Sequence, residues 1–240
     1  MPASLPTVVL VHGAFADAAG WLGVIDELQR DGIPVLAVAN PLRGLASDAA
    51  YVASVTEQIE GPVVLVGHSY GGALITVAGT AENVVALVYI AAFVPEEGES
   101  LRELRDRFAL APLVGHLKET TYPASGARPD ATEVTIQPQA FPEVFAADVP
   151  AAVTKVLAAA QRPLATAAFE ERATAAAWRT KPSWALVAGT DRVINPDVER
   201  FGAERAGATV VELDGASHAV LVSRPKAVAD LILDAARATS

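Results

Sequence analysis

One serine of this chain lies in a context that could make it a nucleophile. Ser69 is the central residue of Gly67-His68-Ser69-Tyr70-Gly71, between the apolar run 62–66 and the apolar segment 72–78. A strand before a G-x-S-x-G segment and a helix after it place the serine on a sharp turn, where its hydroxyl stands clear of both elements. The turn requires small neighbours, because side chains at Gly67 and Gly71 would collide across it. Such a motif also arises by chance in a Gly- and Ala-rich chain, but its flanks favour a nucleophile here.

A serine nucleophile requires a general base, and the chain has only four histidines. His218 follows an expected strand, at the carboxyl end where α/β sheets place their sites, and it is our predicted base. His12 also follows a strand, but holding the adjacent loop is its expected role. His68 lies inside the turn and is expected to pack beside it. His116 falls in a region that we expect to be distant from the site, and we interpret it as a surface residue.

The base in turn requires an acid that orients it. Asp191 ends the buried run 184–188 in a Gly-Thr-Asp sequence and again lies at the carboxyl end of a strand. Asp197 is the alternative, although its place after a proline is more typical of a helix N-terminus. Asp214 is close to His218 in sequence and is expected to belong to a turn. We therefore predict a catalytic triad of Ser69, Asp191 and His218.

A serine nucleophile that attacks a carbonyl group also requires donors for the oxyanion that forms. The N–H group of Tyr70 begins the helix after the serine and points to the place where negative charge would develop. The second donor is expected in the loop after the first strand. Ala14 is our choice there and Phe15 the alternative.

Composition excludes several other classes of protein. The 240 residues are 52% apolar and 19% charged, with a net charge of −10, which disfavours nucleic-acid binding. There is no cysteine, and we find no metal-ligand spacing and no phosphate-binding glycine loop, so we expect neither metal nor cofactor. No apolar run approaches a membrane span. Residues 1–6 show no basic leader region, and we expect a cytoplasmic protein.

Short apolar runs alternate with helical patterns, which indicates an α/β fold with a mostly parallel sheet and helices on both faces. This alternation of strand and helix patterns stops between residues 94 and 182, where prolines are frequent and no strand pattern is found. We predict a core of residues 1–93 and 183–240 and an inserted cap of residues 94–182, with a second independent domain as the alternative. Within the cap, 101–113 and 149–160 are the best helical stretches. The expected strands of the core are 7–11, 33–39, 63–66, 84–90, 184–188 and 209–213.

Four segments carry a resemblance to a known family: 9–14, 64–72, 88–95 and 215–218. They resemble the α/β-hydrolase superfamily, and within it the group of small esterases and hydroxynitrile lyases, including bacterial carboxylesterases and pyrethroid hydrolases. The resemblance implies an α/β-hydrolase fold with about six strands and an inserted, mainly helical cap. It also implies that Ser69, Asp191 and His218 form the triad, and that Ala14 and Tyr70 donate to the oxyanion.

The same resemblance separates two activities. The similar lyases have a threonine after the first-strand histidine and a lysine after the catalytic histidine, where this chain has Gly13 and Ala219. The lysine would stabilise a departing cyanide, so we predict ester hydrolysis through an acyl-enzyme. Alternatives are C–C hydrolysis, lactone opening or perhydrolysis by the same triad, or a receptor of the same fold that binds without turnover. An intact triad favours an enzyme.

The substrate is expected to be a small to medium apolar ester. Basic residues are not concentrated in the cap, which disfavours a free acid or an acyl-CoA. We expect the protein to be a monomer or homodimer, without nucleic-acid or membrane partners. The residues expected to line the substrate pocket are Phe15, Leu110, Leu113, Leu117, Phe141, Phe145 and Leu157.

Overall fold

A computed structural model describes residues 5–123 and 131–239. Its centre is a six-stranded sheet in the order β2-β1-β3-β4-β8-β9, in which every pairing is parallel. The predicted sheet of about six strands is therefore confirmed. Its buried strands are continuous apolar runs, because helices cover both faces. The strands are β1 Thr7–Val11, β2 Val35–Val38, β3 Val63–His68, β4 Val84–Ile90, β8 Ser183–Ala188 and β9 Thr209–Leu213.

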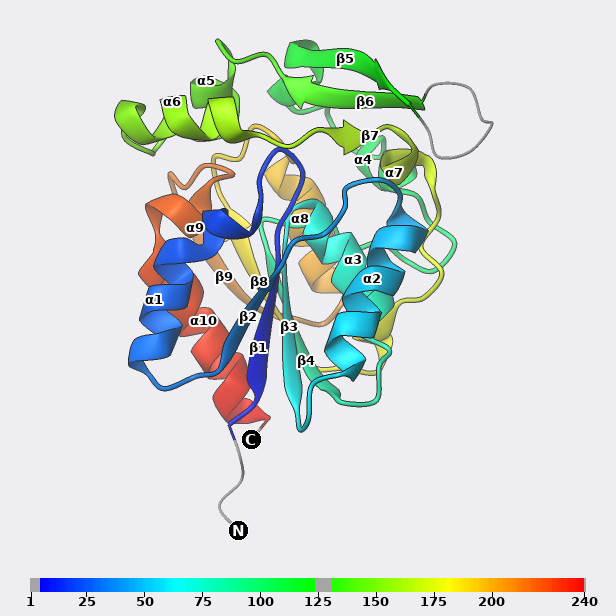
Figure 1. Ribbon diagram of the computed structural model, residues 1–240, viewed down its shortest axis with the longest axis vertical. Coiled ribbons are helices and arrows are strands. Elements are labelled where there is room, and N and C mark those ends of the chain that lie inside the picture. Colours follow the sequence, from blue (N-terminus) through cyan, green and yellow to red (C-terminus); the bar gives the residue numbers. More distant parts are fainter. Residues whose placement is uncertain (1–4, 124–130, 240) are drawn as a thin grey trace.

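Two layers of helices enclose this sheet (Figure 1). α1 (Leu22–Arg30), α9 (Val220–Ser223) and α10 (Pro225–Ala238) cover one face, and α2 (Leu45–Glu57), α3 (Tyr70–Ala78) and α8 (Pro196–Arg205) cover the other. Successive side chains of a strand point to opposite faces. In β1, Val9 and Val11 accordingly pack in one core and Val8 and Leu10 in the other.

Between β4 and β8 the chain forms a cap over the end of the sheet that lies opposite the two termini (Figure 1). The cap contains a three-stranded antiparallel sheet, β5-β6-β7, and the expectation that it lacks strands is wrong. β5 is polar and exposed along most of its length. Its sequence therefore contains no apolar run from which a strand could be predicted. The elements of the cap are α4 Leu101–Arg105, β5 Leu117–Tyr122, β6 Ala131–Ile136, α5 Phe141–Val144, α6 Ala151–Ala160, β7 Leu164–Ala165 and α7 Ala167–Glu170.

The helix expected over 101–113 is much shorter than predicted. α4 ends at Arg105, and a separate turn of 3-10 helix spans Pro112–His116. Further 3-10 turns lie at Ala18–Trp21 and Ala177–Arg179. The other predicted stretch, 149–160, contains α6, and its first residues precede the helix. Pro112 begins the 3-10 turn, where a missing N–H costs no helical hydrogen bond, but a continuous helix over 101–113 would lose a bond at this residue.

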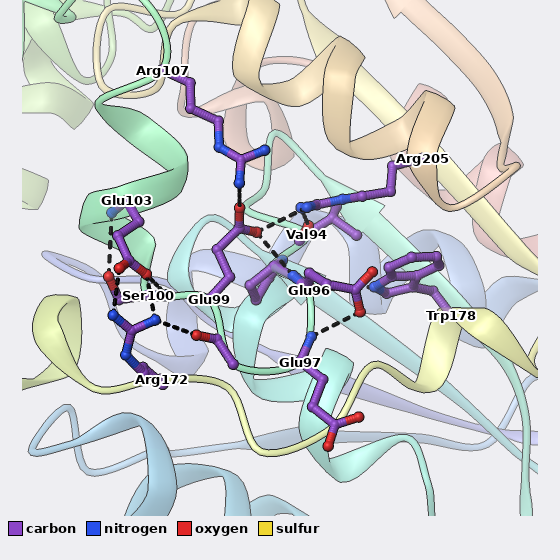
Figure 2. Close-up of polar contacts among 12 residues, drawn as sticks. Val94, Glu96, Glu97, Glu99, Ser100, Glu103, Arg107, Arg172, Trp178 and Arg205 are labelled. Atoms are coloured by element: carbon purple, nitrogen blue, oxygen red, sulfur yellow. Dashed lines mark hydrogen bonds and ion pairs between the residues drawn. The ribbon is translucent and has the colours of Figure 1, made fainter.

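A buried carboxylate joins the start of the cap to α8 (Figure 2). Glu99 is only 6% exposed, and it forms ion pairs with Arg205 of α8 at 2.9 Å and with Arg107 at 2.6 Å. Arg205 also donates to the carbonyl of Val94, and the Trp178 indole donates to Pro95 at 3.0 Å. Because removal of one partner would leave a buried charge uncompensated, these contacts fix the cap relative to α8.

No helix in the described ranges is both long and apolar enough to cross a membrane. The first four residues, part of the segment used for the leader prediction, lie outside the described ranges.

Candidate active site

Ser69 occupies a strained turn between β3 and α3. Its φ of 57° and ψ of −122° are uncommon for a residue with a side chain. A Cβ at Gly67 would lie 2.4 Å from the carbonyl oxygen of Gly71, and one at Gly71 would lie 2.4 Å from that of Val11. Both distances are impossible contacts, so the turn can close against β1 only because both positions are glycine. The G-x-S-x-G segment therefore forms the sharp turn at Ser69 that the sequence predicts.

Asp191 and His218 come together from the carboxyl ends of two adjacent strands. The Nδ1 atom of His218 lies 2.5 Å from Asp191 Oδ2. Asp191 Oδ1 accepts from the backbone N–H groups of Val193 at 2.6 Å and Ile194 at 3.0 Å. Three donors thus hold one carboxylate, which fixes its orientation toward His218. The alternative acid, Asp197, pairs instead with Arg200 on the exposed side of α8.

The other ring nitrogen of His218, Nε2, is buried and has no hydrogen-bond partner within the described residues. This atom would accept the proton of Ser69, and catalytic hydrogen bonds often form only when substrate is bound. The ring is held on two sides: the edge of Phe145 meets it at 5.0 Å, and the ring of His68 lies at 4.6 Å. His218 is therefore confined to the orientation that its bond to Asp191 requires.

His68 positions the loop of His218. Its Nε2 atom lies 2.9 Å from the backbone oxygen of His218, and its Nδ1 atom is buried without a partner among the described residues. Burial, followed by the nearby His218 ring, lowers the pKa of His68 well below its usual range. A neutral ring with its proton on Nε2 satisfies this geometry, since Nε2 then donates to the carbonyl. His68 thus acts beside the turn, as expected from its position.

The two predicted oxyanion donors line one cavity together with Ser69. Tyr70 is the first residue of α3, so its N–H has no acceptor within that helix, and its hydroxyl donates to the buried Asp48 at 2.9 Å. The N–H of Phe15 already donates to the carbonyl of Arg162 at 3.1 Å. Ala14 is buried at the cavity wall and is therefore the favoured donor of the two alternatives.

His12 holds the loop that contains Ala14. Its carbonyl oxygen accepts from Asn40 Nδ2 at 2.7 Å, and its Nδ1 lies 2.8 Å from the carbonyl of Gly13. Arg162, from the cap, donates to the carbonyl of Asn40 at 3.1 Å. Burial lowers the pKa of His12 to about 4, so the ring is neutral near pH 7. Sequence reasoning missed Asn40 and Arg162, because no local pattern links them to this loop.

Above Ser69 lies a cavity of about 380 Å³ between core and cap. Of the predicted pocket residues, Phe15, Leu113 and Leu117 line it. The sequence did not single out several further apolar residues of its wall, namely Phe93, Val134, Leu164, Phe169 and Val193.

Two arginines also line this cavity, contrary to the expectation that the cap would present no concentration of basic residues. Arg102 pairs with Glu170, and Arg105 pairs with Asp106 at 2.7 Å. Glu119 contributes an acidic group to the same wall. Because both arginines already have carboxylate partners, the wall combines opposite charges around a mainly apolar interior.

The remaining predicted pocket residues lie elsewhere. Phe141, Phe145 and Leu157 line a separate small cavity of about 40 Å³, which Phe15 and His68 also border. The rings of Phe141 and Phe145 stack at 4.7 Å. Leu110 is 57% exposed and borders neither cavity. The structure thus divides the predicted pocket between two chambers on either side of Phe15.

The described part of the chain contains no cluster of three or more histidine, aspartate or glutamate residues that could hold a metal ion.

The fold and the arrangement of these side chains define a class of protein. A family model described as the alpha/beta hydrolase family matches residues 8–231. The chain therefore belongs to the alpha/beta hydrolase family.

Several known proteins are similar to the chain. It is 52% identical over 56 residues to a carbendazim hydrolyzing esterase of Nocardioides sp. (strain SG-4G), a match that spans 22% of this chain and 22% of that esterase. Polyneuridine aldehyde esterase has a similar structure, with a TM-score of 0.82 and 19% identity over 96% of this chain and 99% of that one. A pyrethroid hydrolase from Sphingobium faniae JZ-2 has a TM-score of 0.77 and 21% identity, over 98% of both chains. At identities of 19% and 21%, these two structures show that the chain shares their fold.

Proposed function

We propose that this protein is a serine hydrolase that cleaves carboxylic esters through an acyl-enzyme at Ser69. The observation that carries the proposal is the short contact between Asp191 and His218 after the carboxyl ends of β8 and β9, in a structure that also places Ser69 on a strained turn at the wall of a cavity. The names of the similar proteins, two of them esterases and one a pyrethroid hydrolase, support the same reaction class.

In the proposed mechanism, His218 Nε2 takes the proton of the Ser69 hydroxyl as its oxygen attacks the ester carbonyl carbon. The carbonyl electron pair moves onto its oxygen, where the N–H groups of Ala14 and Tyr70 stabilise the negative charge. The bond to the alcohol then breaks, and His218 gives the proton to the departing oxygen. Water repeats the sequence on the acyl-enzyme, which releases the acid and restores Ser69.

The cavity over Ser69 supports a neutral, mainly apolar ester as substrate. Its volume of about 380 Å³ suits a small to medium molecule, and its two arginines are already paired with carboxylates. We further propose that the enzyme works without a metal or cofactor, as a cytoplasmic monomer or homodimer. C–C hydrolysis, lactone opening, perhydrolysis and ligand binding without turnover remain the alternatives that an ester panel would separate.

The test uses Ser69→Ala beside Ser54→Ala, an exposed serine of α2 whose hydroxyl bonds only its own helix. Ser69→Ala should lose covalent labelling by a fluorophosphonate and about 10⁴-fold or more in kcat toward aryl esters, because the triad acts as a unit. Ser54→Ala should match the wild type in both measurements. Retained labelling and activity in Ser69→Ala would assign the nucleophile elsewhere, and an inert wild type would support the receptor alternative.

A further inference from the structure

A second carboxyl group lies buried behind the triad acid. Glu199, on the inner side of α8, is only 3% exposed. Its Oε2 atom accepts from the backbone N–H of Ala188, the last residue of β8, at 3.0 Å. Its Oε1 atom is buried and meets no hydrogen-bond donor in the described part of the chain. A glutamate this deeply buried is unusual unless it is paired or protonated.

Glu199 and Asp191 are both anchored at Ala188. Glu199 accepts from the N–H of Ala188 at 3.0 Å, and the N–H of Asp191 donates to the carbonyl of Ala188 at 3.1 Å. The two carboxyl groups interact, and this interaction contributes to the raised pKa of Glu199. Two ionised carboxylates can only accept, so a hydrogen bond between them requires one proton. Like charges at this range cannot both remain ionised in a buried site.

The surrounding donors decide which of the two carboxyls holds that proton. Asp191 receives three hydrogen bonds, from Val193, Ile194 and His218. Glu199 receives one, from Ala188. Donors stabilise the ionised form in proportion to their number, so the negative charge belongs on Asp191 and the proton on Glu199.

Glu199 forms no ion pair with any residue in the described part of the chain. Arg200 is the neighbouring cation on α8, but it is exposed and paired with Asp197 at 2.6 Å and Glu212 at 2.5 Å. Burial, followed by the charge of Asp191, raises the pKa of Glu199 well above its usual range.

We propose that Glu199 is a positioning residue of the triad, which keeps a proton on Oε1 and donates it to the Asp191 carboxylate behind His218. The donated bond adds a fourth donor to Asp191 and leaves its charge directed at the His218 ring. An ionised Glu199 would instead place a second negative charge behind the triad. The backbone bond to Ala188 holds the group in place, because the end of β8 and the inner face of α8 are fixed to each other there.

The inference rests on the proposed hydrolase function, but its first test does not need turnover. Infrared spectra at pH 7 of the wild type and Glu199→Gln should differ by one protonated carboxyl band, present in the wild type alone. Asp197→Asn, on the exposed side of the same helix, is the matched control and should keep the band. A wild type without this band would overturn the proposal, even if ester hydrolysis is confirmed.

The second test follows the rate of Ser69 labelling by a fluorophosphonate as a function of pH. Glutamine can donate from its amide to Asp191 and accept from Ala188, so Glu199→Gln should retain at least about a third of the rate and the same acid limb. Glu199→Leu removes the donor and should lower the rate about 10-fold or more, because a hydrogen bond to a charged group is lost.

The pH profile of Glu199→Gln distinguishes a protonated Glu199 from an ionised one. If Glu199 were ionised, glutamine would remove a negative charge from beside the triad, and the acid limb would move down by about one pH unit or more. That result would overturn the proposal. Should Glu199→Leu not fold, the infrared band and the glutamine profile still decide the matter. Failure of Ser69 to label in the wild type would refute the proposed function, while the infrared result would stand.

Discussion

Replacement of Gly13 by alanine should impair catalysis through a single methyl group. Gly13 follows the end of β1 and lies directly against the serine turn. A Cβ atom at this position would lie 2.5 Å from the Cβ of Ser69, 2.9 Å from the carbonyl oxygen of His68 and 3.1 Å from Ser69 Oγ. Carbon atoms in contact normally lie about 3.5–4.0 Å apart, so about 1 Å of separation is missing.

The two nearest of these atoms, Ser69 Cβ and the carbonyl oxygen of His68, belong to the serine turn itself and cannot rotate away, and rotation of Ser69 Oγ would misplace the proposed nucleophile. The Ser69 turn is held by the close approach of Gly67 and Gly71, and the loop of Gly13 is held by Asn40. Either the serine or the neighbouring residue Ala14, the proposed oxyanion donor, must therefore move by about 1 Å. A displacement of that size in an active site typically costs about 100-fold in rate. We expect kcat to fall about 100-fold, which corresponds to about 2.7 kcal/mol of transition-state stabilisation.

Steady-state and burst kinetics with an aryl ester would measure this effect, and urea unfolding would report the accompanying strain of about 1–3 kcal/mol. Gly115→Ala is the matched control, because a Cβ there has no atom within 4 Å, and it should behave as the wild type. A Gly13→Ala enzyme with the kcat of the wild type would refute the reasoning. So would an equal loss in the control variant.

Three further predictions concern the acid, the pH dependence and the choice of reaction. Asp191→Asn should lower kcat about 10³–10⁴-fold, whereas Asp197→Asn should have little effect; reversed results would move the acid to α8. His12, whose pKa burial lowers to about 4, and His68, whose pKa is also lowered, should each take up a proton on unfolding below pH 6.5. Stability should therefore fall by about 1.4 kcal/mol per pH unit for each as the pH falls from 6.5 toward 4.5. Glu199 and Asp48, whose pKa values burial raises, act in the opposite direction, so the test compares urea unfolding of the wild type with that of His12→Gln. The variant should lose less stability over this pH range, and an unchanged pH dependence would contradict this account. Finally, the unmodified protein should release no cyanide from mandelonitrile above background, because Ala219 and not a cation follows His218, the proposed base; efficient release would favour the lyase reaction.

The choice between ester and cyanohydrin chemistry also has a structural basis. A threonine in place of Gly13 would meet the same atoms as an alanine and would bring further atoms toward Ser69. Ala219 is buried, and its N–H donates to the carbonyl of Phe145 at 2.9 Å. A lysine at that position would have to place its charge beside apolar rings, where desolvation is costly.

The sequence alone was enough to predict those parts of the protein whose structure depends on residues close together in the chain. The apolar runs predicted all six strands of the main sheet. The inner strands β1, β3, β4 and β8 are apolar because both of their faces are covered, and the more exposed edge strands β2 and β9 are still rich in valine and leucine, which favour strands. The G-x-S-x-G segment predicted the serine turn, since Gly67 and Gly71 are required by contacts within a few residues and with the adjoining strand. The candidates for base and acid could also be narrowed, because few histidines and aspartates follow a strand.

The tertiary structure decided which side chains meet across long separations. The pairing of Asp191 rather than Asp197 with His218, the bond from Ala188 to Glu199, and the link from Arg162 to Asn40 join segments whose approach no local pattern encodes. The cap illustrates the same limit. β5 and β6 pair through backbone groups with mostly polar side chains, so their hydrogen bonds leave no hydrophobic period in the sequence. Periodicity records burial, whereas the partners of a polar or charged group depend on where the whole chain places them.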